Sequence, residues 1–147
     1  MKYKKLGGTK LNCSIIGFGC WGLGGIAYGP VSDKTSINAL NKSLDRGINF
    51  YDTSDLYGYK DDGRSEKILG KAFKKKRSKV ILATKFGLLP HNGWHMPEIY
   101  KHSYLNKALD LSLSRMKTDY IDLMQLHSPS MNILKNKDKM NDIFEFL

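Results

Sequence analysis

Short apolar runs recur along the chain, and each of them ends in a polar loop. Runs of this kind are typical of strands that are buried on both faces of a sheet. Four of them predict strands at residues 15–19, 48–52, 80–85 and 120–126. Ahead of the first strand, residues 2–12 predict a β-hairpin that turns at Gly7 and Gly8.

The segments between the strands place their apolar residues at helical spacing. Helices are therefore predicted from Ser32 or Asp33 to Arg46, from Ser65 onward, and from a cap at Ser103. The loop 87–97 is interrupted by glycine and proline and is not expected to be helical. After Pro129 a polar stretch leads into residues 140–147, which predict the beginning of a last helix.

Strand and helix thus alternate through a single predicted domain, residues 1–147. This order predicts an α/β fold of right-handed βαβ units on a parallel sheet. It fits both an open doubly wound sheet and a (β/α)8 barrel.

A glycine motif after the first strand favours the doubly wound alternative at first sight. Residues 17–22 read Gly-Phe-Gly-Cys-Trp-Gly and match the dinucleotide-binding pattern G-x-G-x-x-G. That pattern binds pyrophosphate only where its third glycine opens a helix. Because further glycines and Pro30 follow, no helix is expected before about residue 32. We therefore expect no Rossmann cofactor site at this motif.

Charge and hydropathy narrow the classes of partner. The net charge of +10 suggests nucleic acid as a ligand, but the lysines are scattered along the chain. Their one dense run, residues 74–77, follows a predicted helix and suits its solvated C-terminal end. The most apolar window, residues 15–27, is too short for a membrane span. We expect neither a nucleic-acid nor a membrane partner.

The cysteine and histidine positions predict no metal site. Cys13 and Cys20 match neither a redox pair nor a zinc pattern and suit the reducing cytoplasm, where we expect the protein to be. His91 and His95 are four residues apart, but Gly93 between them argues against the helix that a metal-binding pair needs.

Ionisable side chains stand at the ends of three successive predicted strands. Asp52 ends the second strand, Lys85 ends the third, and His127 follows the fourth. Because the carboxyl ends of parallel strands open on one face of a barrel, these side chains should converge there, with Tyr57 in the loop above. Singly, each could be an ordinary turn, surface or loop residue. Their matching positions in consecutive units favour a common site.

These four side chains suit proton transfer at neutral pH. A tyrosine has an ordinary pKa of about 10, which is too high for an effective acid–base group. A cation alongside favours the phenolate. Lys85 would supply that cation, and Asp52 would keep the lysine charged and oriented. His127 would hydrogen-bond the substrate oxygen and so place a carbonyl between Tyr57 and a hydride donor.

Three stretches of the chain resemble the aldo-keto reductase family, whose members are (β/α)8 barrels. They are GINFYDTSDLYG with GRSEKILG at residues 47–58 and 63–70, ATKFG at 83–87, and SLSRMKTDYIDLMQLHSP at 112–129. The resemblance implies that the chain is an incomplete TIM barrel, with about the first four βα units behind the hairpin of residues 2–12.

The resemblance also implies a reaction and a cofactor. The family transfers a hydride from NAD(P)H, usually NADPH and in other members NADH, to a small-molecule aldehyde or ketone. Tyr57 would be the general acid, Lys85 and Asp52 would tune it, and His127 would orient the carbonyl. Trp21 would line the nicotinamide pocket, while Asp52 and the backbone of Gly19 and Cys20 would lie near the cofactor ribose. No metal is implied.

The length of the chain sets a limit on that expectation. A complete barrel needs about 250 residues, and the family holds most of its cofactor from the later half. The last helix is also expected to be incomplete. We therefore expect a truncated oxidoreductase that is inactive alone, with a non-catalytic remnant or interaction module as the alternative. Half of a barrel would expose sheet edges through which chains could self-associate.

Overall fold

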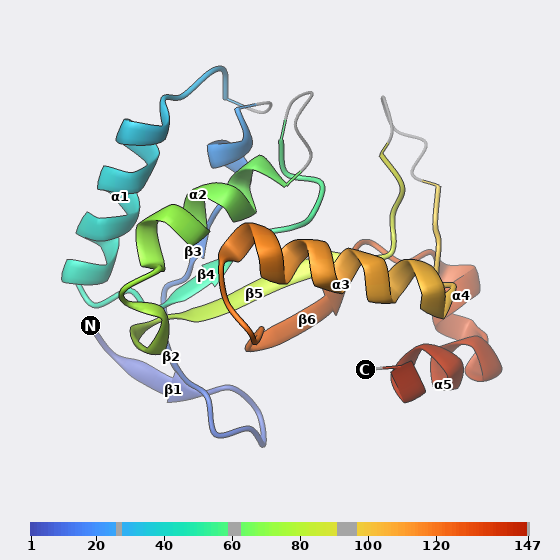
Figure 1. The fold of residues 1–147 in the computed structure, drawn as a ribbon. Coiled ribbons are helices and arrows are strands. Elements are labelled where there is room, and N and C mark those ends of the chain that lie inside the picture. Colours follow the sequence, from blue (N-terminus) through green and yellow to red (C-terminus); the bar gives the residue numbers. More distant parts are fainter. Residues whose placement is uncertain (26–27, 59–62, 91–96, 147) are drawn as a thin grey trace.

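The computed structural model describes residues 1–25, 28–58, 63–90 and 97–146. A four-stranded parallel sheet in the order β3-β4-β5-β6 forms its centre (Figure 1). Its strands are β3 (Phe18–Gly19), β4 (Phe50–Asp52), β5 (Ile81–Phe86) and β6 (Leu123–Leu126). An antiparallel hairpin of β1 (Tyr3–Lys5) and β2 (Asn12–Ser14) precedes the sheet. The predicted α/β order with parallel strands is confirmed.

Helices cover one side of this sheet (Figure 1). They are α1 (Asp33–Asp45), α2 (Arg64–Phe73) and α3 (His102–Met116), followed by α4 (Met131–Lys135) and α5 (Lys137–Phe146) beyond β6. Leu40 of α1, Phe73 of α2 and Met116 of α3 are buried with Tyr51 and Leu82 of the sheet in one apolar cluster. The core therefore lies between the sheet and its helices.

The hairpin is fastened to the amino end of β4. Asn49, just before that strand, accepts a hydrogen bond from the Ser14 amide at 2.7 Å and donates one to the Asn12 carbonyl at 2.9 Å. The hairpin thus lies at the opposite end of the sheet from Asp52, which closes β4.

One of the two predicted helix caps differs from the structure. Ser32 caps α1 as expected, because its hydroxyl accepts from the Thr35 amide at 3.1 Å. The prediction that Ser103 caps α3 is wrong: the cap is Lys101, whose carbonyl accepts from the amides of Tyr104 and Leu105. Ser103 therefore lies inside the first turn.

The first predicted strand is shorter than its apolar run. Only Phe18 and Gly19 form β3, while Ile15 and Ile16 are 60% and 57% exposed. The Ile15 amide donates to the Lys2 carbonyl and so continues the hairpin instead of the sheet. Hydrophobicity predicted burial for these two isoleucines, but more than half of the surface of each remains exposed.

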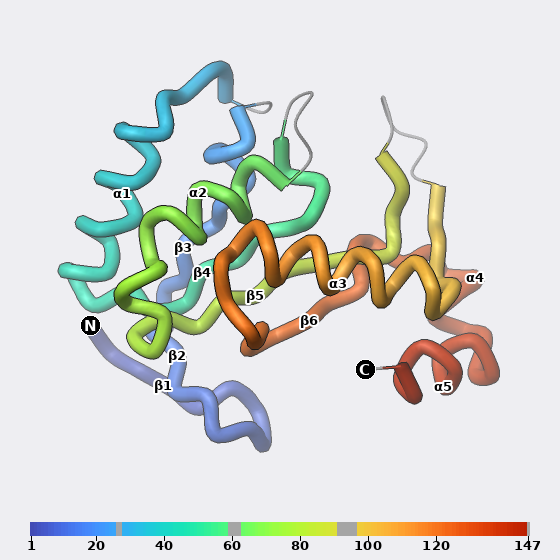
Figure 2. Tube along the Cα trace, viewed as in Figure 1, coloured from blue at the N-terminus to red at the C-terminus, as the bar shows by residue number. Residues whose placement is uncertain are grey.

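The segment after Pro129 is more helical than predicted. The polar stretch contains α4, which Ser130 caps, and α5 begins at Lys137, three residues before the predicted helix. The side chain of Asn136 accepts from the Lys139 amide at 3.0 Å at the start of α5. The trace in Figure 2 shows both helices beyond the carboxyl end of β6, away from α1 and α2.

The basic run 74–77 is only partly a solvated helix end. Lys74 and Lys75 are exposed, but Arg77 donates to Asp122 at 2.6 Å and stacks on the Tyr120 ring at 3.8 Å. Asp122 also accepts from the Leu82 amide. Arg77 therefore joins the segment before β5 to the segment before β6.

Both edges of the sheet are open within the described part of the chain. There β3 pairs only with β4, and β6 pairs only with β5. In the same residues, no helix combines the length and hydrophobicity that crossing a membrane requires.

Candidate active site

The carboxyl ends of the strands bring the four predicted residues together. The register places Gly19 of β3 beside Asp52 of β4, and Lys85 of β5 beside Gln125 of β6. His127 follows β6 directly, and its amide donates to the Phe86 carbonyl at 2.9 Å. The expected convergence is therefore present in the described structure.

The ammonium group of Lys85 is the centre of this cluster. Its Nζ lies 2.7 Å from Oδ2 of Asp52, 2.7 Å from the Thr53 carbonyl and 3.4 Å from the Tyr57 hydroxyl. These three acceptors match the three hydrogens that an ammonium group can donate. The Lys85 side chain is 15% exposed, so little solvent separates its charge from these oxygens.

Tyr57 is held over the strand ends by its backbone. Its carbonyl accepts from the Ser65 amide in the first turn of α2 at 2.9 Å. Gly24 packs so closely that a Cβ there would lie 3.0 Å from the Tyr57 carbonyl carbon and the Gly58 nitrogen. The glycine-rich segment after β3 thus allows a close approach to the tyrosine loop.

Two aromatic rings flank Tyr57. The His127 ring lies edge-on with its centroid 5.9 Å from the tyrosine ring, and the Trp21 ring lies 6.5 Å away. Trp21 is 50% exposed, so it leaves a ring face available beside the tyrosine.

The other residues expected near a cofactor differ in accessibility. Gly19 is exposed, and a Cβ there would meet nothing within 4 Å. Cys20 has no exposed surface; its amide donates to the Asp52 carbonyl, and its own carbonyl accepts from Ser65. Burial raises the pKa of the Cys20 thiol far above its ordinary value. Of this segment, Gly19 and Trp21 present surface to a ligand.

Three further residues complete the cluster, and the sequence reasoning missed them. Gln125 donates to Oδ1 of Asp52 at 3.0 Å. Ser54 lies 3.0 Å from Nδ1 of His127 and also donates to Asp55 at 3.0 Å. The strand period of two could have indicated Gln125, because it lies two residues before His127 and so shares its face.

Asp55 is the carboxyl group with the most altered environment near the site. Burial raises its pKa to about 7, and the Glu66 carboxylate acts in the same direction. Hydrogen bonds from Ser54 and the Leu56 amide, together with the Arg115 charge, oppose that effect. Asp55 therefore titrates near neutral pH.

A buried ion pair between α2 and α3 contacts the strand that carries Lys85. Glu66 of α2 is wholly buried, accepts from the Thr84 hydroxyl at 2.6 Å and pairs with Arg115 of α3 at 3.2 Å. Thr84 precedes Lys85 in β5, so this pair fixes the strand that carries the lysine.

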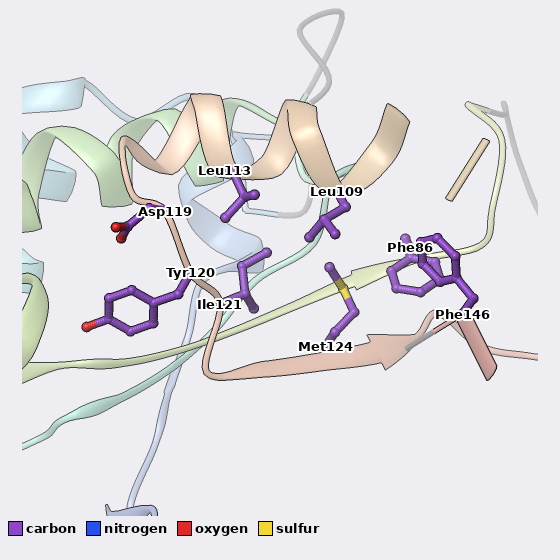
Figure 3. A pocket seen from close by; sticks show the side chains of 8 residues that line it. All are labelled: Phe86, Leu109, Leu113, Asp119, Tyr120, Ile121, Met124 and Phe146. Atoms are coloured by element: carbon purple, nitrogen blue, oxygen red, sulfur yellow. The ribbon is translucent and has the colours of Figure 1, made fainter. Parts of the chain in front are cut away.

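A hollow of about 270 Å³ lies on the other side of the sheet. Its lining is mostly apolar and comes from α3, α5, the end of β5 and the region of β6: Phe86, Leu109, Leu113, Asp119, Tyr120, Ile121, Met124 and Phe146 (Figure 3). Phe86 and Met124 alternate with Lys85 and Gln125 along their strands and so point to the opposite face. We therefore do not assign this hollow to the site.

Metal ligands do not gather in the part of the chain that is described. No group of three histidine, cysteine or carboxylate side chains there could hold a metal ion. His91 and His95 lie outside the described residues.

Comparison with known proteins identifies the family. The sequence matches the model of the aldo/keto reductase family over residues 15–147. The chain belongs to the aldo-keto reductase family. Among curated relatives, aldo-keto reductase YhdN of Bacillus subtilis is 38% identical over 154 residues, which cover 99% of this chain and 44% of that protein. Aldo-keto reductase yakc, NADP(+), of Schizosaccharomyces pombe is 41% identical over 116 residues, covering 76% and 33%.

Solved aldo-keto reductase structures agree with the fold. The holo form of aldo-keto reductase AKR11C1 from Bacillus halodurans superposes with a TM-score of 0.82 at 35% identity, covering 99% of this chain and 45% of that one. The four-stranded sheet and its helices are therefore part of a (β/α)8 barrel. The chain spans less than half the length of these three relatives.

Proposed function

We propose that this aldo-keto reductase chain carries the proton-donating half of an NADP(H)-dependent carbonyl reductase site. Its substrate would be a small molecule with an aldehyde or ketone group. The observation that carries the proposal is the position of Lys85 Nζ, between the Asp52 carboxylate at 2.7 Å and the Tyr57 hydroxyl at 3.4 Å.

Each residue has a distinct part in the proposed reaction. As negative charge develops on the substrate oxygen, the Tyr57 hydroxyl donates its proton to that oxygen. Lys85 stabilises the phenolate that remains, since a cation beside it favours the charged form. Asp52 and the Thr53 carbonyl hold the ammonium group in place. His127, beside the tyrosine ring, would bind and orient the same oxygen.

The proposed cofactor fits the surface that is present. NADPH, when bound, would supply the hydride. The exposed Gly19 leaves room for close approach, the half-exposed Trp21 offers a ring face, and the Asp52 side chain is 36% exposed. We propose NADP(H) rather than NAD(H) because the Schizosaccharomyces pombe relative carries NADP(+) in its name. Two buried cysteines without a disulfide suit the cytoplasm that we propose as its location.

A chimera tests the proposal. Residues 1–147 would be joined to the part of the Bacillus subtilis relative that lies beyond the matched region. We expect this protein to oxidise NADPH with at least one aldehyde in a panel, and the 147-residue chain alone to be inactive. Tyr57→Phe in the chimera should lower kcat by about 100-fold or more, as for loss of a general acid. Tyr120→Phe, a change at a ring distant from the cluster, is the matched control. Equal turnover by Tyr57→Phe and the parent would remove Tyr57 from its role.

The open sheet edges favour a second candidate, a non-catalytic module that binds another chain. In the described residues β3 and β6 each lack one neighbour, and unpaired edges are sites for strand addition. Titration of NADPH into the 147-residue chain, followed by tryptophan fluorescence, separates the two candidates. Micromolar binding would contradict the non-catalytic module. Sedimentation at increasing concentration would reveal self-association through the edges.

A further inference from the structure

Three side chains form a hydrogen-bonded chain from the interior to the candidate active site. Asp55 is 5% exposed and Ser54 is fully buried, in the loop that follows β4. The Ser54 hydroxyl lies 3.0 Å from Oδ1 of Asp55 and 3.0 Å from Nδ1 of His127. The serine therefore links a buried carboxyl group to the histidine ring beside Tyr57.

The Ser54 hydroxyl can serve these two neighbours in only two ways. A hydroxyl has one hydrogen to donate and two lone pairs to accept with. The Leu56 amide, at 3.2 Å, uses one lone pair. One donor and one acceptor remain for Asp55 and His127. If Ser54 donates to Asp55, it must accept from His127; if it donates to His127, it must accept from Asp55.

We propose that Asp55 and Ser54 are positioning residues that decide which ring nitrogen of His127 carries its proton. When the Asp55 carboxyl is ionised, Ser54 donates to it and accepts from Nδ1–H of His127. When the carboxyl is protonated, its hydroxyl donates to Ser54, Ser54 donates to Nδ1, and the proton of the neutral ring is on Nε2. No bond other than those to hydrogen changes between the two arrangements.

The two arrangements differ by one bound proton. Protonated Asp55 with neutral His127 holds the same number of protons as ionised Asp55 with an imidazolium ring, and both place a proton on Nε2. Loss of one proton leaves ionised Asp55 and a neutral ring that is protonated on Nδ1. The ring proton of His127 therefore changes nitrogen as one proton enters or leaves the hydrogen-bonded series of Asp55, Ser54 and His127.

The surroundings place this proton exchange near neutral pH. Burial raises the pKa of Asp55 to about 7, an effect that Glu66 strengthens and Arg115 weakens. The other ionisable groups that face Asp55 across a hollow toward α3 are Tyr104 and Lys107. His127 faces the Tyr57 ring, with the Lys85 ammonium 5.0 Å from that ring's centroid.

A consequence for turnover rests on the proposed function. A carbonyl oxygen only accepts hydrogen bonds, so a histidine that orients it must present Nε2–H. We therefore expect carbonyl reduction to be favoured while the Asp55–Ser54–His127 chain holds the additional proton, and to slow as that proton is lost.

Nitrogen NMR of the 147-residue chain tests the proton exchange without cofactor or turnover. Two-bond ¹H–¹⁵N correlations distinguish a protonated from a bare ring nitrogen, and His127→Gln assigns the signals among the four histidines. In the unmutated chain we expect Nε2 to be protonated at acidic pH and bare at alkaline pH, where Nδ1 carries the proton. A ring that keeps its proton on Nε2 at alkaline pH would overturn the proposal.

Ser54→Ala and Asp55→Asn give a second, independent comparison. With the link cut, the neutral ring in Ser54→Ala should no longer adopt the Nδ1–H form that the parent adopts at alkaline pH. Asp55→Asn removes the titrating carboxyl, so the neutral ring should hold one tautomer across the pH range in which the parent exchanges its proton between Nε2 and Nδ1. Ser103→Ala, at an exposed position of α3, should behave as the parent. The same alkaline tautomer in Ser54→Ala and the parent would refute the link, whereas an inactive chimera with the expected tautomers would refute only the proposed function.

Discussion

Gly70 is the position at which a single added methyl group should disturb the support of the site. It lies in α2, where the helix packs on the end of α3. A Cβ at Gly70 would collide with the Arg115 carbonyl oxygen and lie 2.8 and 2.9 Å from the carbonyl carbon and Cα of Met116. All of these are backbone atoms, so no side-chain rotation relieves the contact.

Two opposing effects decide the sign for Gly70→Ala. Alanine in a helix interior is more favourable than glycine by about 1 kcal/mol. Overpacking in a well-packed interior costs about 1–3 kcal/mol, and more where backbone must shift. Relief would require α2 to move away from α3, which would lengthen the 3.2 Å pair between Glu66 and Arg115. Because backbone must shift, we take about 2–3 kcal/mol for the overpacking and subtract about 1 kcal/mol for the preference of a helix for alanine, which leaves an expected net loss of about 1–2 kcal/mol in unfolding free energy.

Urea unfolding followed by circular dichroism measures this loss. Gly8→Ala is the matched control, since a Cβ there would meet nothing within 4 Å and its backbone is not left-handed. The control should be neutral or slightly stabilising, because alanine restricts the unfolded chain. A Gly70→Ala chain as stable as the Gly8→Ala chain would refute the reasoning about the contact between α2 and α3.

Four further predictions follow from the same contacts. Glu66→Ala should lower the unfolding free energy by about 3–5 kcal/mol, because it leaves Arg115 and the Thr84 hydroxyl without their buried partner, and Glu66→Gln should cost less; urea titration of both variants checks the order. Arg77→Lys should cost about 1–2 kcal/mol in the same assay, since a single ammonium nitrogen cannot replace the separate bonds of Nε to Thr118 and of Nη2 to Tyr120 and Asp122; an unchanged midpoint would contradict that account. Burial raises the pKa of Asp55 from its ordinary value of 3.8 to about 7 in the folded chain, so its protonation stabilises the fold below about pH 4 and that contribution is lost as pH rises to about 7. Asp55→Asn should therefore gain stability relative to the parent across this interval, and a constant difference would count against it. Cys13 and Cys20 should resist alkylation in the folded chain and react in urea, because both thiols are buried and burial raises their pKa; rapid labelling of Cys20 under native conditions would be inconsistent with its position.

The period of apolar residues was enough to predict the sheet and its three long helices. Strands such as β5 are apolar on both faces, and α1 carries both a serine cap and a glycine stop. The prediction failed where local chemistry was ambiguous. Ser103 is a good capping residue, but the backbone at Lys101 starts α3 earlier. The polar stretch expected after Pro129 did not include the caps at Ser130 and Asn136, although Met131, Ile133 and Leu134 between them are apolar.

The exposed isoleucines have a different cause. Ile15 and Ile16 are hydrophobic enough to predict burial, yet a side chain is buried only where other residues pack against it, and both remain largely exposed. Sequence pattern reports what a residue prefers and not which partner is present, so it could not foresee this exposure.

The candidate site was predictable chiefly through the ionisable residues at the strand ends, with Tyr57 in the loop above them. Asp52, Lys85 and His127 follow strands, and that position indicated a common patch. Ser54 and Gln125 carry no charge, and their roles depend on distances of 3.0 Å that no spacing reveals.

Transfer of deuterium from NADPH labelled at C4 tests the central claim most directly. The chimera described above would be incubated with labelled NADPH and an aldehyde that it accepts, and the alcohol would be analysed by mass spectrometry. We predict one deuterium on the former carbonyl carbon with the parent, and yield lowered about 100-fold or more by Tyr57→Phe while NADPH binding is retained. Equal deuterated alcohol from both proteins would contradict the assignment of Tyr57 as the proton donor.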